Sequence, residues 1–177
     1  MEGIGRVGPT GTNRDDAALV VRAALLVAVP WANGGGVTRV IADGPDYRLS
    51  LATIADAGPF SSIPGVLRHF ALVAGKIELT GAVTGVFDET GAPCTFAGDS
   101  PVHAIPLGGP ALALNLMVPV GAPALRLERC EPGATVEALA VFACDAQTIA
   151  GVALGMHDTL FPAAPVRLAA RALRVVR

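Results

Sequence analysis

The chain consists of short segments in which apolar and polar residues alternate, separated by glycine and proline. The clearest pattern places Leu49 and Leu51 on one face of a strand and Arg48 and Ser50 on the other. The 21 glycines and 14 prolines bound segments of about five to eight residues, which is the spacing of a β-sandwich or barrel. The pattern therefore predicts an all-β fold, with strands over residues 37–41, 47–54, 68–73, 76–80, 102–105, 112–117, 125–129 and 135–144.

An apolar run over residues 17–31 is the one segment that resembles a membrane or signal sequence. Arg22 interrupts the run, Asp15 and Asp16 precede it, and Pro30 ends it. It is too short to span a bilayer. Its length instead predicts a buried strand and the segment that leads into it.

The two ends of the chain carry weaker patterns. Residues 1–15 are polar, rich in glycine and without periodicity, which predicts a mobile segment. Over residues 165–177 arginines recur at helical spacing, whereas Val175 and Val176 favour a strand, so a terminal helical turn and a strand both remain open.

Composition and charge limit the kinds of partner and the cellular compartment that the sequence predicts. The chain is 52% hydrophobic but only 16% charged, and an interface with a second copy, forming a homodimer, would cover the apolar surface that this implies. The formal net charge of −2 gives no extended positive field, which excludes nucleic acid as a partner. Three cysteines without C-x-x-C spacing predict neither a disulfide framework nor a zinc site, and they favour a reducing, cytoplasmic location.

The sequence lacks the usual signatures of catalysis, so it predicts no catalytic residue, metal or cofactor. His69, His103 and His157 form no H-x-H pair, although three histidines from distant strands could still meet. The G-x-G-x-x-G match at 3–8 follows no strand, and no G-x-S-x-G motif is present. The glycines at 34–36 predict a sharp turn into the next strand.

Polar side chains on otherwise apolar strands are better candidates for a site. The mouths of β-barrels bind ligands through apolar walls with a few convergent polar groups. Two arginines in one mouth, Arg39 and Arg68, would hold a carboxylate through charge-assisted hydrogen bonds. Asn115 would orient a second polar group, and aromatic rings would wall the pocket. The predicted ligand-binding residues are Trp31, Asn33, Thr38, Arg39, Phe60, Ser61, Arg68 and Asn115.

Several motifs in order along the chain resemble those of one known family. The segment P-W-A-N-G-G-G-V-T-R at 30–39 is followed by Y-R-L-S-L-A at 47–52 and by G-P-F-S at 58–61. With I-P-G at 63–65, Arg68, Gly75, F-A-G-D-S-P-V at 96–102, G-P at 109–110 and N-L-M at 115–117, these motifs resemble the HutD/Ves family. Departures from the family pattern include Ala32, Tyr47, Ala113 and Val118-Pro119.

This resemblance implies a bicupin, with two cupin-like β-barrel or jelly-roll halves in one chain. The implied unit covers residues 16–177, with a first half over about 16–105 and a second over 106–177, and it allows strands to be exchanged between them. The resemblance also implies a regulatory or sensor protein of histidine utilisation. Its partner would be a small anion such as urocanate or a formyl or formimino derivative of glutamate.

Two other functions fit the same residues. A cupin-type enzyme could act without a metal or through a non-standard metal site built from the scattered histidines. A purely structural oligomer would also use an alanine-rich, apolar surface, and a filled barrel without a pocket would favour it.

Overall fold

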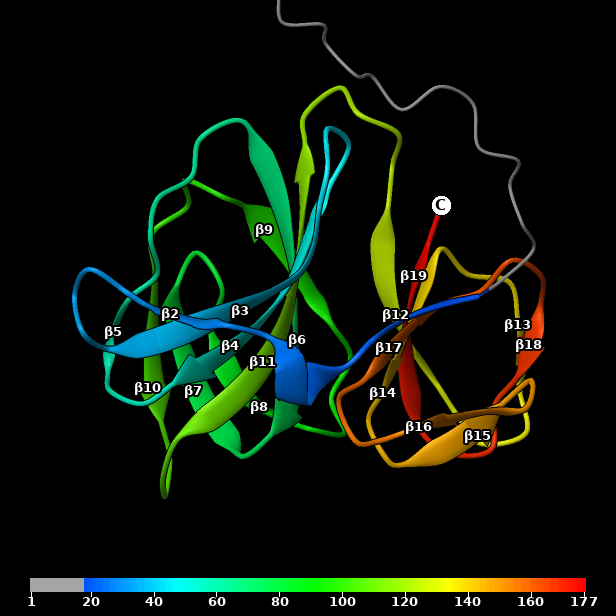
Figure 1. Cartoon of the computed structure of the whole chain (residues 1–177). Helices are drawn as coiled ribbons and strands as arrows, with labels where there is room; N and C mark the ends of the chain where they lie inside the picture. Colours follow the sequence, from blue (N-terminus) through cyan, green and yellow to red (C-terminus); the bar gives the residue numbers. More distant parts are fainter. Residues whose placement is uncertain (1–17) are drawn as a thin grey trace, which may run out of the picture.

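The computed structural model describes residues 18–177 and contains strands almost throughout. The expected mobile segment at 1–15 and the glycine motif at 3–8 lie outside the described residues. Figure 1 shows two groups of strands side by side, one formed by β2–β11 and the other by β12–β19 with β1. The prediction of an all-β chain is confirmed, and its two groups of antiparallel sheets have the arrangement expected of a bicupin.

Two facing sheets form the first half. The inner, six-stranded sheet has the order β2-β3-β4-β11-β6-β9, and it comprises β2 (Ala28–Pro30), β3 (Gly36–Asp43), β4 (Arg48–Ile54), β6 (Val66–Ala74), β9 (Cys94–Ala97) and β11 (Ala111–Pro119). The outer sheet has the order β5-β10-β7-β8, and it comprises β5 (Gly58–Pro59), β7 (Lys76–Gly81), β8 (Gly85–Asp88) and β10 (Val102–Pro106).

The second half is built on one five-stranded sheet and two small hairpins. The sheet has the order β1-β17-β14-β19-β12, and it comprises β1 (Leu19–Val21), β12 (Arg126–Cys130), β14 (Ala140–Ala143), β17 (Thr159–Phe161) and β19 (Ala172–Val176). The hairpins pair β13 (Thr135–Val136) with β18 (Val166–Arg167) and β15 (Gln147–Ile149) with β16 (Val152–Leu154).

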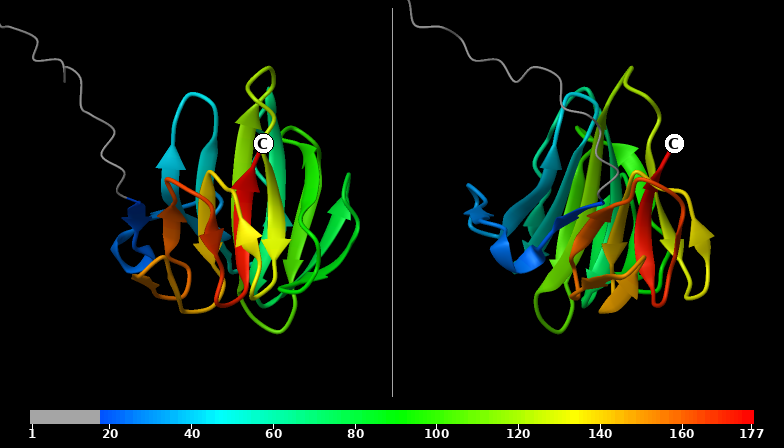
Figure 2. Two further views of the ribbon diagram at one scale, coloured as in Figure 1. Left: turned by 90° about the vertical axis from the view of Figure 1, so that its right-hand side faces the viewer. Right: turned by 45° about the vertical axis from the view of Figure 1, so that its right-hand side comes forward.

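Three hydrophobic cores arrange these sheets in layers, which Figure 2 shows from two further directions. One core lies between the two sheets of the first half and includes Phe70 and Leu79. Another fills the second half behind its five-stranded sheet. The core between them joins the halves, because Leu51 and Leu116 of the six-stranded sheet pack in one cluster with Phe142 of the five-stranded sheet. The six-stranded sheet is thus covered on both faces.

The passage between the halves differs from the expected boundary near residue 105. Strand β11 lies in the middle of the first-half sheet, paired with both β4 and β6, so the chain changes sheets only after Pro119. Its continuous apolar run is suited to a strand buried on both faces. Conversely, β1, which precedes the first half in the chain, pairs with β17 of the second half.

Two predicted strands are wrong in detail. From residue 18 onward, the apolar run forms two short edge strands joined by a 3-10 turn at Ala23–Leu25, and it is largely exposed because each strand lies at the edge of its sheet. Segment 135–144 divides into β13 and β14, because the chain leaves a hairpin at Val136 and enters the larger sheet at Ala140. Of the two alternatives left open for residues 165–177, the structure has the strand, as β18 and β19. None of the described segments is a helix of the length and apolarity that crossing a membrane requires.

Candidate functional site

A cavity of about 290 Å³ lies on the face of the six-stranded sheet that points into the first half. Thr38, Arg68 and Asn115 reach it from β3, β6 and β11. Six of the eight predicted site residues line this cavity, namely Trp31, Thr38, Phe60, Ser61, Arg68 and Asn115.

The pairing of β4, β11 and β6 places the polar side chains in two adjacent rows, each of which runs across the strands. Met117 of β11 pairs with Arg48 on one side and with Arg68 on the other. Two residues along, Asn115 pairs with Ser50. Because side chains two residues apart share a face of a strand, both rows point into the cavity. The Cα atoms of the two arginines are about 10 Å apart, the width of two strand spacings.

Arg68 is the most unusual residue in the cavity, because its charged side chain is only 5% exposed. Its Nη2 donates to the Ser61 carbonyl oxygen at 3.2 Å, and its guanidinium carbon lies 5.3 Å from the Phe60 ring centroid. The centroid of the Phe96 ring, which stacks on Phe60, lies 5.7 Å from the same carbon. Nε is buried and has no hydrogen-bond partner among the described residues. The Arg68 guanidinium therefore keeps one unpaired donor in the wall of the cavity.

Among residues 18–177, no acidic side chain lines the cavity to balance this charge. Burial lowers the pKa of Arg68, but an arginine keeps its proton at neutral pH because its ordinary pKa lies far above neutrality. Arg48 adds a second positive charge, and its one ion pair among the described residues is a long contact of 3.8 Å with the exposed Asp43. The cavity therefore has a net positive field in apolar surroundings, where electrostatic interactions are stronger than in water.

Two further polar side chains, those of Ser50 and Asn115, line the cavity next to the arginines. Ser50 is 2% exposed and Asn115 is 7% exposed, and no side-chain hydrogen bond joins either to another of the described residues. Buried hydroxyl and amide groups are normally hydrogen-bonded. Both side chains are therefore available to a ligand in the cavity.

The Trp31 ring is fixed by the glycine-rich turn that follows it. Its Nε1 donates to the Thr38 hydroxyl at 2.8 Å. Gly34 has a φ of +75°, so the predicted sharp turn is confirmed. A Cβ at Gly36 would overlap the Thr53 carbonyl oxygen and press on the Trp31 ring, so only glycine allows the ring to pack here.

Arg39 and Asn33, the other two predicted site residues, do not line this cavity. Arg39 precedes Val40 and follows Thr38, both of which line the cavity, so its own side chain leaves the opposite face of β3. Its Nη1 donates to the Thr53 hydroxyl at 3.2 Å. Asn33 is exposed, and its Oδ1 accepts from the Gly35 amide in the turn.

Arg48 and Ser50 belong to the cavity but were not among the predicted site residues. The signal was present in the alternation of β4, which places both on the face opposite Leu49 and Leu51. The same rule applied to β3 separates Arg39 from Thr38. Strict alternation therefore assigns Arg48, rather than Arg39, as the second arginine.

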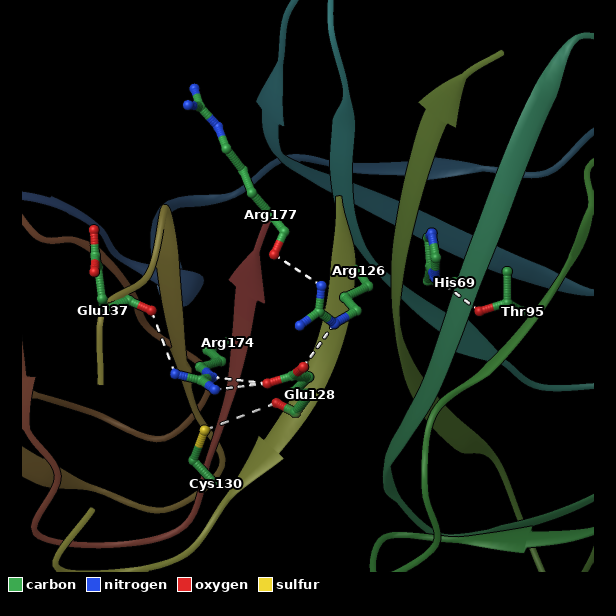
Figure 3. Close-up of polar contacts among 8 residues, drawn as sticks. All are labelled: His69, Thr95, Arg126, Glu128, Cys130, Glu137, Arg174 and Arg177. Carbon is green, nitrogen blue, oxygen red and sulfur yellow. Dashed lines mark hydrogen bonds and ion pairs between the residues drawn. The ribbon is translucent and has the colours of Figure 1, made fainter. Parts of the chain in front are cut away.

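The histidines lie apart from this cavity and from one another. His69 is buried on the opposite face of β6, where its Nδ1 lies 2.8 Å from the Thr95 hydroxyl (Figure 3). His103 is exposed on β10, and His157 stacks on Phe142 in the second half. Burial lowers the pKa of both His69 and His157. Within residues 18–177, no three His, Cys, Asp or Glu side chains gather as metal ligands would.

The layered sheets and this cavity define an all-β bicupin with a pocket in its first half. Residues 23–173 match the family model of HutD, and the chain belongs to the HutD family. The resemblance found in the sequence is thus confirmed.

Relatives agree with this assignment. Protein Ves from Citrobacter koseri is 38% identical over 112 residues, which cover 57% of this chain and 54% of that protein. Protein Ves from Cronobacter sakazakii is 36% identical over 110 residues, 56% of each chain. The chain spans about half the length of these curated relatives.

Solved structures extend the likeness over most of the chain. HutD from Pseudomonas fluorescens SBW25 has a TM-score of 0.73 and 28% identity, covering 90% of this chain and 98% of that chain. A conserved protein of unknown function from Pseudomonas aeruginosa PAO1 has a TM-score of 0.69 and 25% identity, covering 90% and 92% of the two chains.

Proposed function

We propose that this chain is a regulatory or sensor protein whose first-half pocket binds a small organic carboxylate. The observation that carries the proposal is Arg68, a buried guanidinium with an unpartnered Nε in the wall of a cavity that no acidic residue of the described chain lines. A buried charge is costly unless it is paired. An anionic ligand would provide the missing partner.

A carboxylate suits this arginine in geometry as well as in charge. Arg171 of the same chain shows the pairing, since its Nε and Nη2 lie 2.9 Å and 3.0 Å from the two carboxylate oxygens of Asp145. In the pocket, the Arg68 guanidinium would pair with the carboxylate, and Arg48 would draw it in from the exposed side. Ser50 and Asn115 would bind a second polar group of the ligand.

Membership of the HutD family supports a ligand from histidine breakdown, namely urocanate or a formyl or formimino derivative of glutamate. Each carries a carboxylate together with a second polar group, which matches the two rows of polar side chains. We place this binding in the cytoplasm, in keeping with the three free cysteines Cys94, Cys130 and Cys144.

Calorimetric titration of urocanate, N-formylglutamate and propionate into the protein tests the proposal. Arg68→Gln should weaken binding of the preferred carboxylate by about 30-fold or more, equivalent to about 2 kcal/mol for a buried charge that loses its partner. Arg39→Gln is the matched control, because the Arg39 side chain lies on the face of the same sheet that points away from the cavity. It should leave the affinity unchanged.

Equal losses in the two variants, or none in either, would contradict the assignment of Arg68. The cupin-enzyme alternative is tested in the same samples by following the carboxylates by NMR over several hours. Consumption of a ligand that depends on Arg68 would replace the sensor function with catalysis.

A further inference from the structure

A second cavity, of about 250 Å³, lies at the junction of the two halves. We propose that this junction cavity binds a small zwitterion of the α-amino acid class. Val73 and Glu89 line it from the first half, and Arg129, Glu131 and Arg171 line it from the second. It shares no lining residue with the first-half pocket, so it constitutes a separate site.

Arg129 is the candidate for holding the carboxylate of such a ligand. Its side chain crosses from β12 to the first half, where Nε donates to the Gly91 carbonyl oxygen and Nη2 donates to the Leu72 carbonyl oxygen at 2.6 Å. These carbonyl groups orient the guanidinium without neutralising it. No carboxylate of the described chain forms an ion pair with it, and Nη1 has no hydrogen-bond partner there.

Glu89 and Glu131 are the candidates for holding the ammonium group. Both line the same cavity as Arg129, yet neither forms an ion pair among the described residues. Burial lowers the pKa of Arg129 and the hydrogen bond to Asp145 raises the pKa of Arg171, while the charge of Glu89 makes a smaller contribution at both arginines without contacting either. Opposite charges thus line one cavity without direct pairing. A molecule that carries both charges can pair its carboxylate with Arg129 and its ammonium group with Glu89 and Glu131.

Other ligand classes fit this cavity less well. A simple anion would meet two carboxylates, and a simple cation would meet Arg129, while Arg171 is already paired with Asp145. Cys130 and Cys144 also line the cavity, but burial raises the pKa of both thiols, to about 11 for Cys144. Both thiols are therefore protonated at neutral pH, and among residues 18–177 no three His, Cys, Asp or Glu side chains gather as metal ligands would. The volume and the apolar Val73 and Ala172 suit a short aliphatic side chain.

L-valine and two analogues that each lack one charge provide the test. Isovalerate lacks the ammonium group, and isobutylamine lacks the carboxylate. Calorimetric titration up to 20 mM ligand, roughly the scale of weak small-molecule sites, should show one-to-one binding of L-valine. Both analogues should bind at least about tenfold more weakly. Absence of L-valine and L-threonine binding, or equal affinity for isovalerate, would overturn the proposal.

Three variants locate the binding. The double variant Glu89→Gln/Glu131→Gln should weaken L-valine binding by about tenfold or more, because the ammonium loses its charged partners. Glu137→Gln is the matched control, since Glu137 is an exposed second-half carboxylate outside the cavity, and it should bind normally. Binding should also persist in Arg68→Gln, which alters only the first-half pocket. Loss in Arg68→Gln with retention in the double variant would place L-valine in that pocket and refute the junction site.

Discussion

At the scale of single residues, Arg68 combines favourable contacts with an uncompensated cost. Its guanidinium gains from the Phe60 and Phe96 rings and from the Ser61 carbonyl oxygen. Nε nevertheless loses its water on burial without gaining a partner, which costs about 1 to 3 kcal/mol. A side chain that destabilises the ligand-free protein in this way is characteristic of a binding site.

Arg68→Met should therefore stabilise the ligand-free protein while it abolishes carboxylate binding. Methionine fills similar space without a charge, and replacing a buried charge by an apolar residue is often stabilising. We expect a gain of about 1 kcal/mol, or a rise in Tm of about 2 to 4 °C, measured by scanning calorimetry. Arg39→Met, outside the cavity, should give no gain. A lower Tm for Arg68→Met would show that the aromatic contacts outweigh the burial cost.

The sequence predicts which residues line the pocket only where the alternation of side chains between the two faces of each strand is applied strictly. Thr38 and Asn115 could be placed because each is a polar residue on an apolar strand. Arg39 could not belong beside Thr38, since neighbours in a strand face opposite ways. The unpartnered Nε of Arg68 could not be predicted at all, because it depends on packing of Phe60 and Phe96 from other segments.

At the scale of elements, the N-terminal segment Leu19–Pro30 acts as a strap between the halves. Figure 1 shows it crossing from β17 to the edge of the six-stranded sheet beside β3. Asp158, only 6% exposed, fixes the middle of the strap by accepting from Arg22 Nη1 at 2.7 Å and from the Ala23 amide at 2.9 Å. One buried carboxylate thus holds both a side chain and the backbone of the strap.

Asp158→Asn should destabilise the protein by about 2 to 3 kcal/mol, because hydrogen bonds to a charged group are the strong ones. Urea unfolding at pH 7 measures the difference. Asp145→Asn is the matched control, since it removes the exposed ion pair with Arg171 and should cost less than about 1 kcal/mol. Equal losses would contradict the special role of the strap.

The pH dependence of the same variant follows from the pKa of Asp158. Burial acts to raise this pKa, but the hydrogen bond from Arg22 and those from backbone amides lower it below its ordinary value. A carboxyl group with a lowered pKa contributes stability above its unfolded pKa of about 4 and loses it as the pH falls further. The gap between wild type and Asp158→Asn should therefore shrink below about pH 4.

Strands buried on both faces were the easiest elements to predict, and edge strands the hardest. Segments 47–54 and 112–117 lie within or closely match β4 and β11, because their side chains must fill cores on both sides. The run 17–31 is equally apolar but exposes Leu25 and Val27, with relative exposures of 80% and 79%. Hydrophobicity alone did not distinguish an edge strap from a buried strand, since that depends on which strands lie beside it.

At the scale of the whole molecule, the central core makes the two halves a single packing unit. Leu116 is completely buried between the six-stranded and five-stranded sheets, and Arg129 bridges the same junction through backbone carbonyl groups. Much of the apolar composition that suggested an interface between copies is buried at this interface within the chain. The halves should therefore depend on each other for stability.

We expect the two halves to unfold together in urea. Trp31 fluorescence reports on the first half, and alkylation of the Cys130 thiol, which is 7% exposed, reports on the second. Leu79→Ala removes a completely buried side chain from the first-half core alone and should cost about 2 to 5 kcal/mol. In a cooperative molecule it shifts the Trp31 and Cys130 transitions equally, as Leu116→Ala should also do. If Leu79→Ala moved only the Trp31 transition, the central core would join two independently stable halves, and a ligand bound in one pocket could not stabilise the other half.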